Sequence, residues 1–296
     1  MTPIRTILAA TDLSGPARNA VVRAASIAQH TGAQLTLQHV VSSGALDSLR
    51  HLFATQPDDL QQRLLDEARD EVHALAAELC APHVASADIH LSAGSVQTEI
   101  ASHADALDAD LLVLGARGAS LVRDLMIGST TERVLRKTGR PLLVVRRGAR
   151  HGYRRVLIPV DFSPRSLKAI RVTRELAPRA EITLLHAFEV PFEGLLRHSG
   201  VSEEELASLH ANARREASAQ MAELIAAAGL QDDAVQQVVV HGEPSVHILD
   251  QEQLQGCELI VIGKRGLGML EELLLGSVTK HILTQARGDV LVIDRV

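Results

Sequence analysis

Aromatic side chains are nearly missing from this chain of 296 residues. They make up 2% of it, with no tryptophan, and the 30 lysines and arginines do not outnumber the 36 aspartates and glutamates. Proteins that hold single-stranded nucleic acid stack its bases on aromatic rings inside a positively charged groove. We therefore expect no nucleic acid partner. The core is left to Ala, Val, Leu and Ile, a bias typical of helices packed on a buried parallel sheet.

Cysteine is also scarce, and long apolar runs are absent. Cys80 and Cys257 occupy non-equivalent places in the two halves, without the spacing of a disulfide framework or a metal site, so we expect two buried, inert thiols. No stretch approaches the roughly 20 apolar residues that span a bilayer. The apolar run near the N-terminus stops at Thr11-Asp12, too early for a secretory signal. We expect a cytoplasmic protein without membrane contact.

What the chain does contain is one glycine pattern, present twice. Gly115-Ala116-Arg117-Gly118 is followed by nine residues and Gly128-Ser129, and Gly263-Lys264-Arg265-Gly266 by nine residues and Gly276-Ser277. Each copy follows a short aliphatic run and leads into a helical pattern. A strand, a glycine-rich loop and a helix start present backbone N–H groups to a phosphate. Repetition at identical internal spacing indicates a functional unit inside a duplicated domain, because glycines that only end strands need not keep that spacing.

Short aliphatic runs alternate with amphipathic helical patterns in both halves. We predict domains at 1–147 and 154–296, joined by a polar, exposed linker at 148–153. Alternating strands and helices give parallel sheets with right-handed crossovers. We expect two α/β domains, each an open five-stranded Rossmann-like sheet with helices on both faces. The sequence alone does not fix the strand order, and our prediction of 3-2-1-4-5 assumes that the first and fourth strands are neighbours. That order would bring Asp12, after the first strand, and Gly115, after the fourth, to one crevice beyond the strand ends.

These motifs resemble the universal stress protein family in tandem form, and its ATP-binding branch in particular. The resemblance rests on Gly-x2-Gly-x9-Gly-Ser, on strands ending in Thr11-Asp12 and Val160-Asp161, and on His39-Val40 in a second strand. It implies ATP as ligand, with Mg²⁺ as an optional companion. The nucleotide-binding residues that it implies are Asp12, Val40, Gly115, Arg117, Gly118, Gly128, Ser129 and Thr130 in the first half, and Asp161, Ala187, Gly263, Arg265, Gly266, Gly276, Ser277 and Thr279 in the second.

The resemblance also assigns these residues to parts of the nucleotide. Asp12 and Asp161 would lie beside the adenine and ribose, and the backbone of Val40 or Ala187 would read the adenine edge. Gly115 and Gly263 would lie against the ribose. The phosphates would be held by Gly118, Gly128, Ser129 and Thr130 in one half, and by Gly266, Gly276, Ser277 and Thr279 in the other.

The two copies differ in charge and size. The nine-residue spacer of the second copy contains Glu271 and Glu272, which would repel a triphosphate unless Mg²⁺, Lys264 or Arg265 offsets them. In the first copy Arg123 and Asp124 cancel. The second half also has Val278 in place of Thr130 and Ala187 in place of Val40. We expect the first half to bind ATP at least as tightly as the second.

The patterns of several enzyme classes are missing. There is no Walker A sequence, no Gly-x-Gly-x-x-Gly after the first strand and no Gly-x-Ser-x-Gly elbow, and no base for phosphoryl transfer stands out. We expect a nucleotide-dependent regulator rather than a fast catalyst. Two alternatives stay open: a slow Mg²⁺-dependent ATPase or nucleotidyl-transfer enzyme, and a scaffold with degenerate sites. A phosphoacceptor role for Asp12 or Asp161 is disfavoured, because the acidic pair of receiver domains is missing.

Histidines give no metal signature by their spacing, so we expect no metal site. His39 and His186 each stand alone in an apolar strand and are interpreted as core or rim residues. The closing strands, Leu142–Val145 and Val290–Ile293, would be apolar sheet edges, which are association surfaces. In the proteins that the chain resembles such edges pair across a twofold axis. We therefore expect the two halves to pair within the chain through these strands, with a homodimer as a further expectation.

Overall fold

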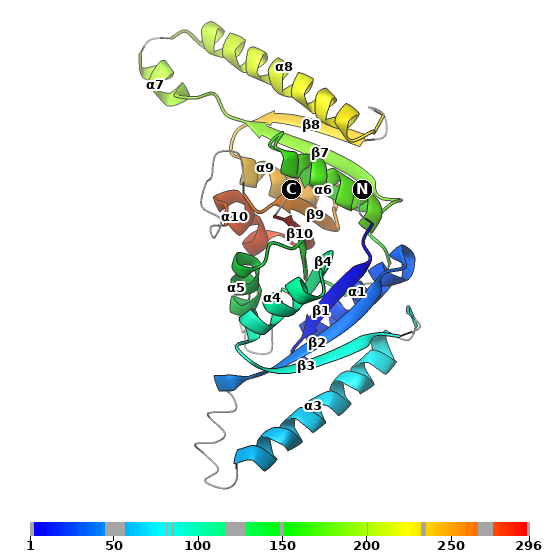
Figure 1. Ribbon diagram of the computed structural model, residues 1–296. Helices are drawn as coiled ribbons and strands as arrows, with labels where there is room; N and C mark the ends of the chain where they lie inside the picture. Colours follow the sequence, from blue (N-terminus) through cyan, green and yellow to red (C-terminus); the bar gives the residue numbers. More distant parts are fainter. Residues whose placement is uncertain are drawn as a thin grey trace.

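The computed structural model describes residues 3–44, 57–80, 82–84, 86–116, 128–148, 151–199, 201–231, 235–265 and 275–294. Two similar halves follow one another (Figure 1). The first contains β1 (Thr6–Thr11), α1 (Gly15–Thr31), β2 (Gln34–Ser42), α3 (Pro57–Leu79), β3 (Asp88–Gly94), α4 (Val96–Ala106), β4 (Leu111–Gly115), α5 (Ser129–Lys137) and β5 (Leu142–Val145). The second contains β6 (Arg155–Pro159), α6 (Pro164–Leu176), β7 (Glu181–Phe188), α7 (Glu193–His198), α8 (Glu203–Ala227), β8 (Val235–His241), α9 (Pro244–Gln255), β9 (Leu259–Gly263), α10 (Ser277–Gln285) and β10 (Asp289–Ile293).

Local sequence signals explain where the helices begin and end. The Ser14 hydroxyl accepts the N–H of Ala17 at the start of α1, and Gly32 ends that helix in the left-handed region at φ 73°. Few other residues adopt that conformation without strain. Ser202 forms a full capping box with Glu205 before α8. Ser163 occupies the N-cap of α6 as expected, but its side chain makes no cap hydrogen bond, and its hydroxyl donates to Asp161.

The strands of the described residues form one sheet in the order β3-β2-β1-β4-β5-β10-β9-β6-β7-β8. Each half of this sheet has the expected order 3-2-1-4-5, which is thereby confirmed. Within each half neighbouring strands are parallel. The halves meet where β5 and β10 pair antiparallel, with Leu143 opposite Leu291. The expected pairing of the closing strands within the chain is therefore present, and each strand covers the other's apolar edge.

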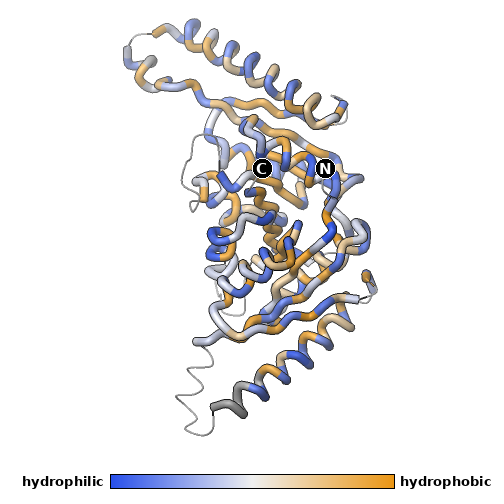
Figure 2. The backbone as a smooth tube through the Cα atoms, viewed as in Figure 1, coloured by the Kyte–Doolittle hydropathy of each residue, from blue (hydrophilic) through white to orange (hydrophobic). Residues whose placement is uncertain are grey.

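The core lies on both faces of this sheet. One face packs against α1, α3, α6 and α8, and the other against α4, α5, α9 and α10. Figure 2 shows the central strands coloured as mostly hydrophobic, while α3 and α8 alternate between hydrophilic and hydrophobic residues. This alternation is typical of helices with one face on a core and one face in water. No helix within the described ranges is long and apolar enough to cross a membrane.

Some expected elements have other bounds. The third strand was expected near 84–91 but runs over Asp88–Gly94, and the helix that opens at Ser95 continues to Ala106. The α7 helix was not expected at all. It is only six residues long, too short for a periodic apolar pattern to stand out.

The expectation that the linker 148–153 is exposed is wrong at its last residue, Tyr153. Tyr153 is buried, with its hydroxyl donating to Asp289 at 2.7 Å. Asp289 in the second half also accepts the backbone N–H groups of Arg146 and Arg147 at 2.8 and 3.3 Å. Arg23 from α1 lies over the Tyr153 ring and pairs with Asp289 at 3.4 Å. The link between the halves is thus fastened to both of them by one buried carboxylate.

Both cysteines are expected to resist alkylation in the folded protein. Cys80 and Cys257 are buried free thiols, as expected, and burial raises the pKa of each to about 11. The thiolate is the reactive form. Iodoacetamide at pH 8 should therefore label the native chain at least about 100-fold more slowly than the urea-unfolded chain, whose thiols have a pKa of about 8.5. The native rate should rise as the pH approaches 11. Equal rates for native and unfolded protein would contradict this expectation.

Candidate functional site

A cavity of about 280 Å³ lies beyond the carboxyl ends of β1, β2 and β4, beside the start of α5. It is the crevice between β1 and β4 at which the strand order reverses, where ligands bind in open parallel sheets. Six residues expected from the sequence line it: Asp12, Val40, Gly115, Gly128, Ser129 and Thr130. Arg117, Gly118, Arg123 and Asp124 lie outside the described residues.

The second half contains a matching cavity of about 280 Å³. It is lined by Asp161, Ala187, Gly263, Arg265, Gly276, Ser277 and Thr279, all of them expected. Gly266, Glu271 and Glu272 fall outside the described residues. The tertiary structure therefore brings together residues that are up to 118 positions apart in sequence, from Asp12 to Thr130, and repeats the arrangement.

The glycine loops are closed at their base by the same hydrogen bonds in both halves. The N–H of Gly128 donates to the Ala116 carbonyl at 2.8 Å, and the N–H of Gly276 donates to the Lys264 carbonyl at 3.0 Å. Ala116 and Lys264 in turn donate to the closing strands, to Val145 at 2.8 Å and Ile293 at 2.7 Å. Each loop thus leaves the sheet and returns at one point, which fixes the start of the following helix against the end of a strand.

The starts of these helices lack side-chain caps. Gly128 and Gly276 are the N-cap residues of α5 and α10, and neither helix has a side-chain cap hydrogen bond. The first N–H groups of a helix have no partner within the helix, and the helix dipole places partial positive charge there. Because both N-caps line the cavities, each cavity presents main-chain donors suited to an anionic group.

In each half a threonine hydroxyl binds the carbonyl of the first glycine of the loop. The Thr131 hydroxyl donates to the Gly115 carbonyl at 2.9 Å, and the Thr279 hydroxyl donates to the Gly263 carbonyl at 2.8 Å. The equivalent of Thr279 is therefore Thr131, which the sequence analysis missed by choosing Thr130. The threonine three positions after each Gly of Gly-Ser was the signal that could have identified it. Both hydroxyls are already engaged in holding the end of a strand to a helix.

The two aspartates are fixed by the turns that follow them. Oδ1 of Asp12 accepts the backbone N–H and hydroxyl of Ser14 at 3.1 and 2.5 Å. Oδ1 of Asp161 accepts the N–H and hydroxyl of Ser163 and the hydroxyl of Ser166 at 3.0, 2.6 and 2.7 Å. Such turns are favoured by Asp before a helix start. They hold each carboxylate at the edge of its cavity.

His39 and His186 hold the strands behind these aspartates. Nδ1 of His39 lies 2.9 Å from the Thr11 carbonyl, and Nδ1 of His186 lies 2.8 Å from the Val160 carbonyl. Each ring is half-buried. The interpretation of both as core or rim residues is confirmed.

Gln38 is a cavity residue that the sequence analysis did not select. It lines the first cavity and is fully buried, and neither its amide nitrogen nor its amide oxygen has a hydrogen-bond partner among the described residues. A buried amide without a partner is costly. The position is held by Leu185 in the second cavity. The first cavity therefore offers a donor and an acceptor in its wall where the second offers only hydrocarbon.

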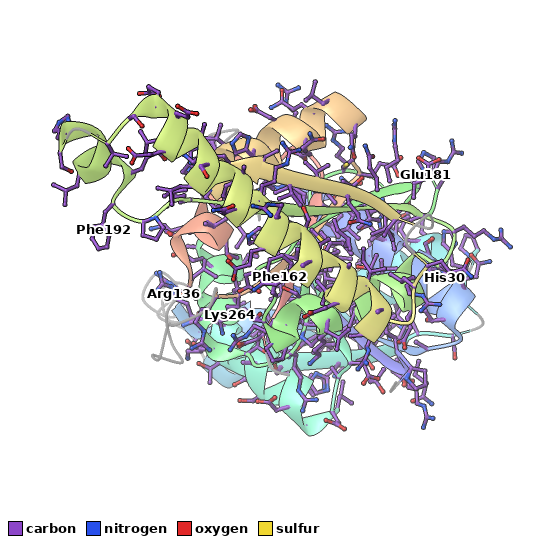
Figure 3. The ribbon with its side chains drawn as sticks, turned by 90° about the horizontal axis from the view of Figure 1, so that it is seen from above. His30, Arg136, Phe162, Glu181, Phe192 and Lys264 are labelled. Carbon is purple, nitrogen blue, oxygen red and sulfur yellow. The ribbon has the colours of Figure 1, made fainter. Side chains whose placement is uncertain are left out.

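Lys264 does not face the second cavity, contrary to one of the roles considered for it. Its side chain is buried within the body of the molecule (Figure 3). Nζ lies 2.7 Å from Asp294 and 3.2 Å from the carbonyl of Thr138 in the first half. Arg265 does line the cavity, and its Nη2 lies 3.4 Å from Asp294. Of the two cations, only Arg265 is placed to meet a ligand.

Comparison with known proteins agrees with this duplicated architecture. The model of the universal stress protein family matches residues 3–146 and, a second time, residues 152–294. The chain belongs to the universal stress protein family. It is a tandem member, because the family unit occurs in each half.

Individual relatives of this universal stress protein are distant. Universal stress protein Rv2005c from Mycobacterium tuberculosis (strain ATCC 25618 / H37Rv) is 30% identical over 198 residues, which cover 62% of this chain and 62% of that protein. The chain thus spans less than two thirds of that relative's length. Universal stress protein YxiE from Bacillus subtilis (strain 168) is 26% identical over 146 residues, or 48% of this chain and 99% of that protein. The chain also superposes on the crystal structure of a universal stress protein from Archaeoglobus fulgidus DSM 4304. The match covers 100% of both chains, with a TM-score of 0.66 at 18% identity. At that identity it supports the fold alone.

Proposed function

We propose that this universal stress protein binds adenine nucleotide, with ATP as the leading candidate, in one or both cavities and acts as a nucleotide-dependent regulator. The observation that carries the proposal is the meeting of an uncapped helix start, a closed glycine loop and a strand-end aspartate at each cavity. The helix start suits the phosphates, and the carboxylate suits ribose hydroxyls or the adenine amino group. Val40 and Ile100 supply apolar surface for the adenine ring in the first cavity.

The energy required is within reach of such a site. A micromolar complex needs about 8 kcal/mol, and one helix terminus contributes only about 0.3–2 kcal/mol. Several N–H bonds, the aspartate and burial of the base must therefore act together. No group among the described lining residues is set up as a base for attack on a phosphate, which favours a regulator over a fast enzyme. Mg²⁺ would be held by the phosphates and water rather than by a dedicated protein cage.

We further propose that the first cavity binds nucleotide at least as tightly as the second. Gln38 adds a buried donor and acceptor that can pair with the polar edge of a base, whereas Leu185 cannot. Arg165 and Arg265 give the second cavity positive charge, but Arg165 also donates to the backbone carbonyl of Asp294 at 3.0 Å, and Arg265 lies 3.4 Å from its carboxylate. Their attraction for phosphate is thereby shared with a residue of the chain.

The test is a nucleotide titration of the full chain with matched variants. Small molecules released from denatured protein are first identified by mass spectrometry, and nucleotide-free protein is then titrated with ATP and Mg²⁺ by calorimetry. Asp12→Ala and Asp161→Ala should each weaken one site by about 10- to 100-fold, the cost of losing a hydrogen bond to a charged group. Asp66→Ala removes an exposed carboxylate on α3 that bonds to Arg69 and Gln62 on the same helix, and should change neither site.

Three outcomes would contradict parts of this proposal. No binding of ATP, ADP or AMP and no shift of the melting temperature would favour a scaffold with degenerate sites. Turnover of Mg²⁺-ATP far above background that is abolished by Ser129→Ala would favour an enzyme. An affinity that falls in Asp161→Ala but not in Asp12→Ala would reverse the ranking of the two cavities.

A further inference from the structure

Two histidines and a glutamate from three separate elements meet at the outer end of the second half. Nε2 of His241, the last residue of β8, lies 3.0 Å from Oε2 of Glu193, the first residue of α7. Nε2 of His210, from α8, lies 3.3 Å from Oε1 of the same carboxylate. The two imidazole rings are 4.2 Å apart between centroids. One carboxylate thus faces two ring nitrogens, one with each oxygen.

Hydrogen bonding does not fully account for this arrangement. Nε2 of His210 is shielded from solvent and makes no hydrogen bond within the described part of the chain, although Oε1 of Glu193 is near. The ring nitrogen is therefore aimed toward the carboxylate without the alignment of a donor. A buried polar atom of this kind needs another partner.

We propose that Glu193, His210 and His241 bind a divalent transition-metal ion of the zinc class. One ligand atom from each residue can be chosen so that all three lie within 4.8 Å of one another. Ligands of a tetrahedral zinc ion at about 2.0–2.1 Å stand about 3.3 Å apart, so the three atoms need to move little to share one ion. Two imidazoles and a carboxylate suit Zn²⁺ and its neighbours rather than Mg²⁺ or Ca²⁺, which prefer oxygen ligands.

The surroundings allow an ion to reach the three side chains. They also leave one coordination position of that ion unfilled by the protein. The side chains of Glu193, His210 and His241 are 20%, 28% and 35% exposed. Three protein ligands leave the fourth tetrahedral position for water or an exogenous ligand, as in zinc sites that are not closed by the protein. On its other side His241 contacts the Phe188 ring at 5.4 Å between centroids, which limits how the imidazole can turn.

The ion would join the short α7 helix to α8, which is itself packed on the core. The α7 and α8 helices form an arm that extends beyond the sheet (Figure 1), and the residue before α7, Phe192, points outward with 78% of its surface exposed (Figure 3). A metal joining α7, α8 and β8 closes two long segments of chain at once, and such binding stabilises the folded state. His241 also pairs with Phe188, next to the cavity residue Ala187.

The experiment uses tag-free full-length chain, stripped with a chelator and titrated with ZnCl₂ in competition with a chromophoric chelator. One Zn²⁺ per chain is expected, together with a rise in melting temperature. His210→Ala and Glu193→Gln should each weaken binding by more than about 100-fold, since even the loss of partners outside the ligand shell costs 10- to 100-fold. Co²⁺ in place of Zn²⁺ should give the absorption of a four- or five-coordinate nitrogen and oxygen site, and the spectrum should be lost in both variants.

A second histidine pair provides the matched control. His90 and His103 stack at 3.8 Å in the first half, and within the described ranges no third His, Cys, Asp or Glu completes that pair as a ligand group. His103→Ala should leave zinc affinity and stoichiometry unchanged. Glu193→Gln preserves the size of the side chain, so the proposal is tested even if His210→Ala does not fold. Substoichiometric binding by the wild type, or one-to-one binding that survives Glu193→Gln, would overturn the proposal.

Discussion

Asp289→Ala is expected to lower the free energy of unfolding by about 3–5 kcal/mol, the usual cost of breaking a buried ion pair by removing one partner. The Asp289 side chain is 1% exposed and pairs with Arg23. It also accepts hydrogen bonds from Tyr153 and from the backbone of Arg146 and Arg147. Alanine would leave a buried guanidinium, a buried hydroxyl and two N–H groups without this acceptor.

Urea denaturation followed by circular dichroism measures this effect. Because Asp289 joins β10 to α1 and to the link between the halves, we expect the midpoint to fall and the transition of the two halves to lose its cooperativity. Asp105→Ala is the control: Asp105 also pairs with an arginine, Arg140, but its side chain is 62% exposed. Exposed pairs contribute about 0–1 kcal/mol. If Asp289→Ala lowers the free energy of unfolding by less than about 1 kcal/mol, the hydrogen bonds and ion pair of Asp289 do not contribute to stability as proposed.

Asp294→Ala is the second substitution for which we expect a loss of about 3–5 kcal/mol. It removes the carboxylate that lies 2.7 Å from Nζ of Lys264 and 3.4 Å from Nη2 of Arg265, both of them buried. Among the described residues the Lys264 ammonium would keep only the Thr138 carbonyl, and a buried charge without a counter-charge is costly. Thermal and urea unfolding of the full chain measure the loss.

A double variant separates loss of the pair from loss of packing. Lys264→Met with Asp294→Leu removes both charges of the closer pair and keeps side chains of similar length, so part of the stability should return, because apolar replacements of buried pairs are often neutral or better. Arg265 still loses the carboxylate 3.4 Å away. Nucleotide affinity of the second cavity should not fall in this double variant, since Lys264 does not line it. A clear loss of affinity that also occurs in Lys264→Met alone would mean that Lys264 acts on the ligand after all.

The alternation of strands and helices could be read from local patterns. Buried strands such as Leu111–Gly115 and Leu259–Gly263 are short aliphatic runs, and helix starts such as Ser14 and Ser202 use side chains that satisfy free N–H groups locally. These signals depend on neighbours within a few residues. The glycine pattern predicted more than local structure, because its exact repetition indicated one ligand site in each half before any contact was known.

Long-range contacts escaped the same reasoning. Tyr153 looked like part of a polar linker, yet it is buried because Asp289, 136 positions away, accepts its hydroxyl. Gln38 was not singled out in the sequence, and it becomes part of a cavity wall only when β1, β2 and β4 end side by side. The α7 helix is too short to leave a periodic signal.

The sequence by itself determined the duplicated α/β fold, because that depends on periodicity and on a spacing that occurs twice, whereas the pairing of the closing strands and most residues around the two cavities followed from its resemblance to the universal stress protein family. Tertiary structure alone decided that Lys264 turns inward to Asp294, that an unpaired amide faces the first cavity but not the second, and that Glu193, His210 and His241 converge. These features join residues that are distant in the chain, and their free energies arise from burial and charge pairing that exist only once the layers are assembled.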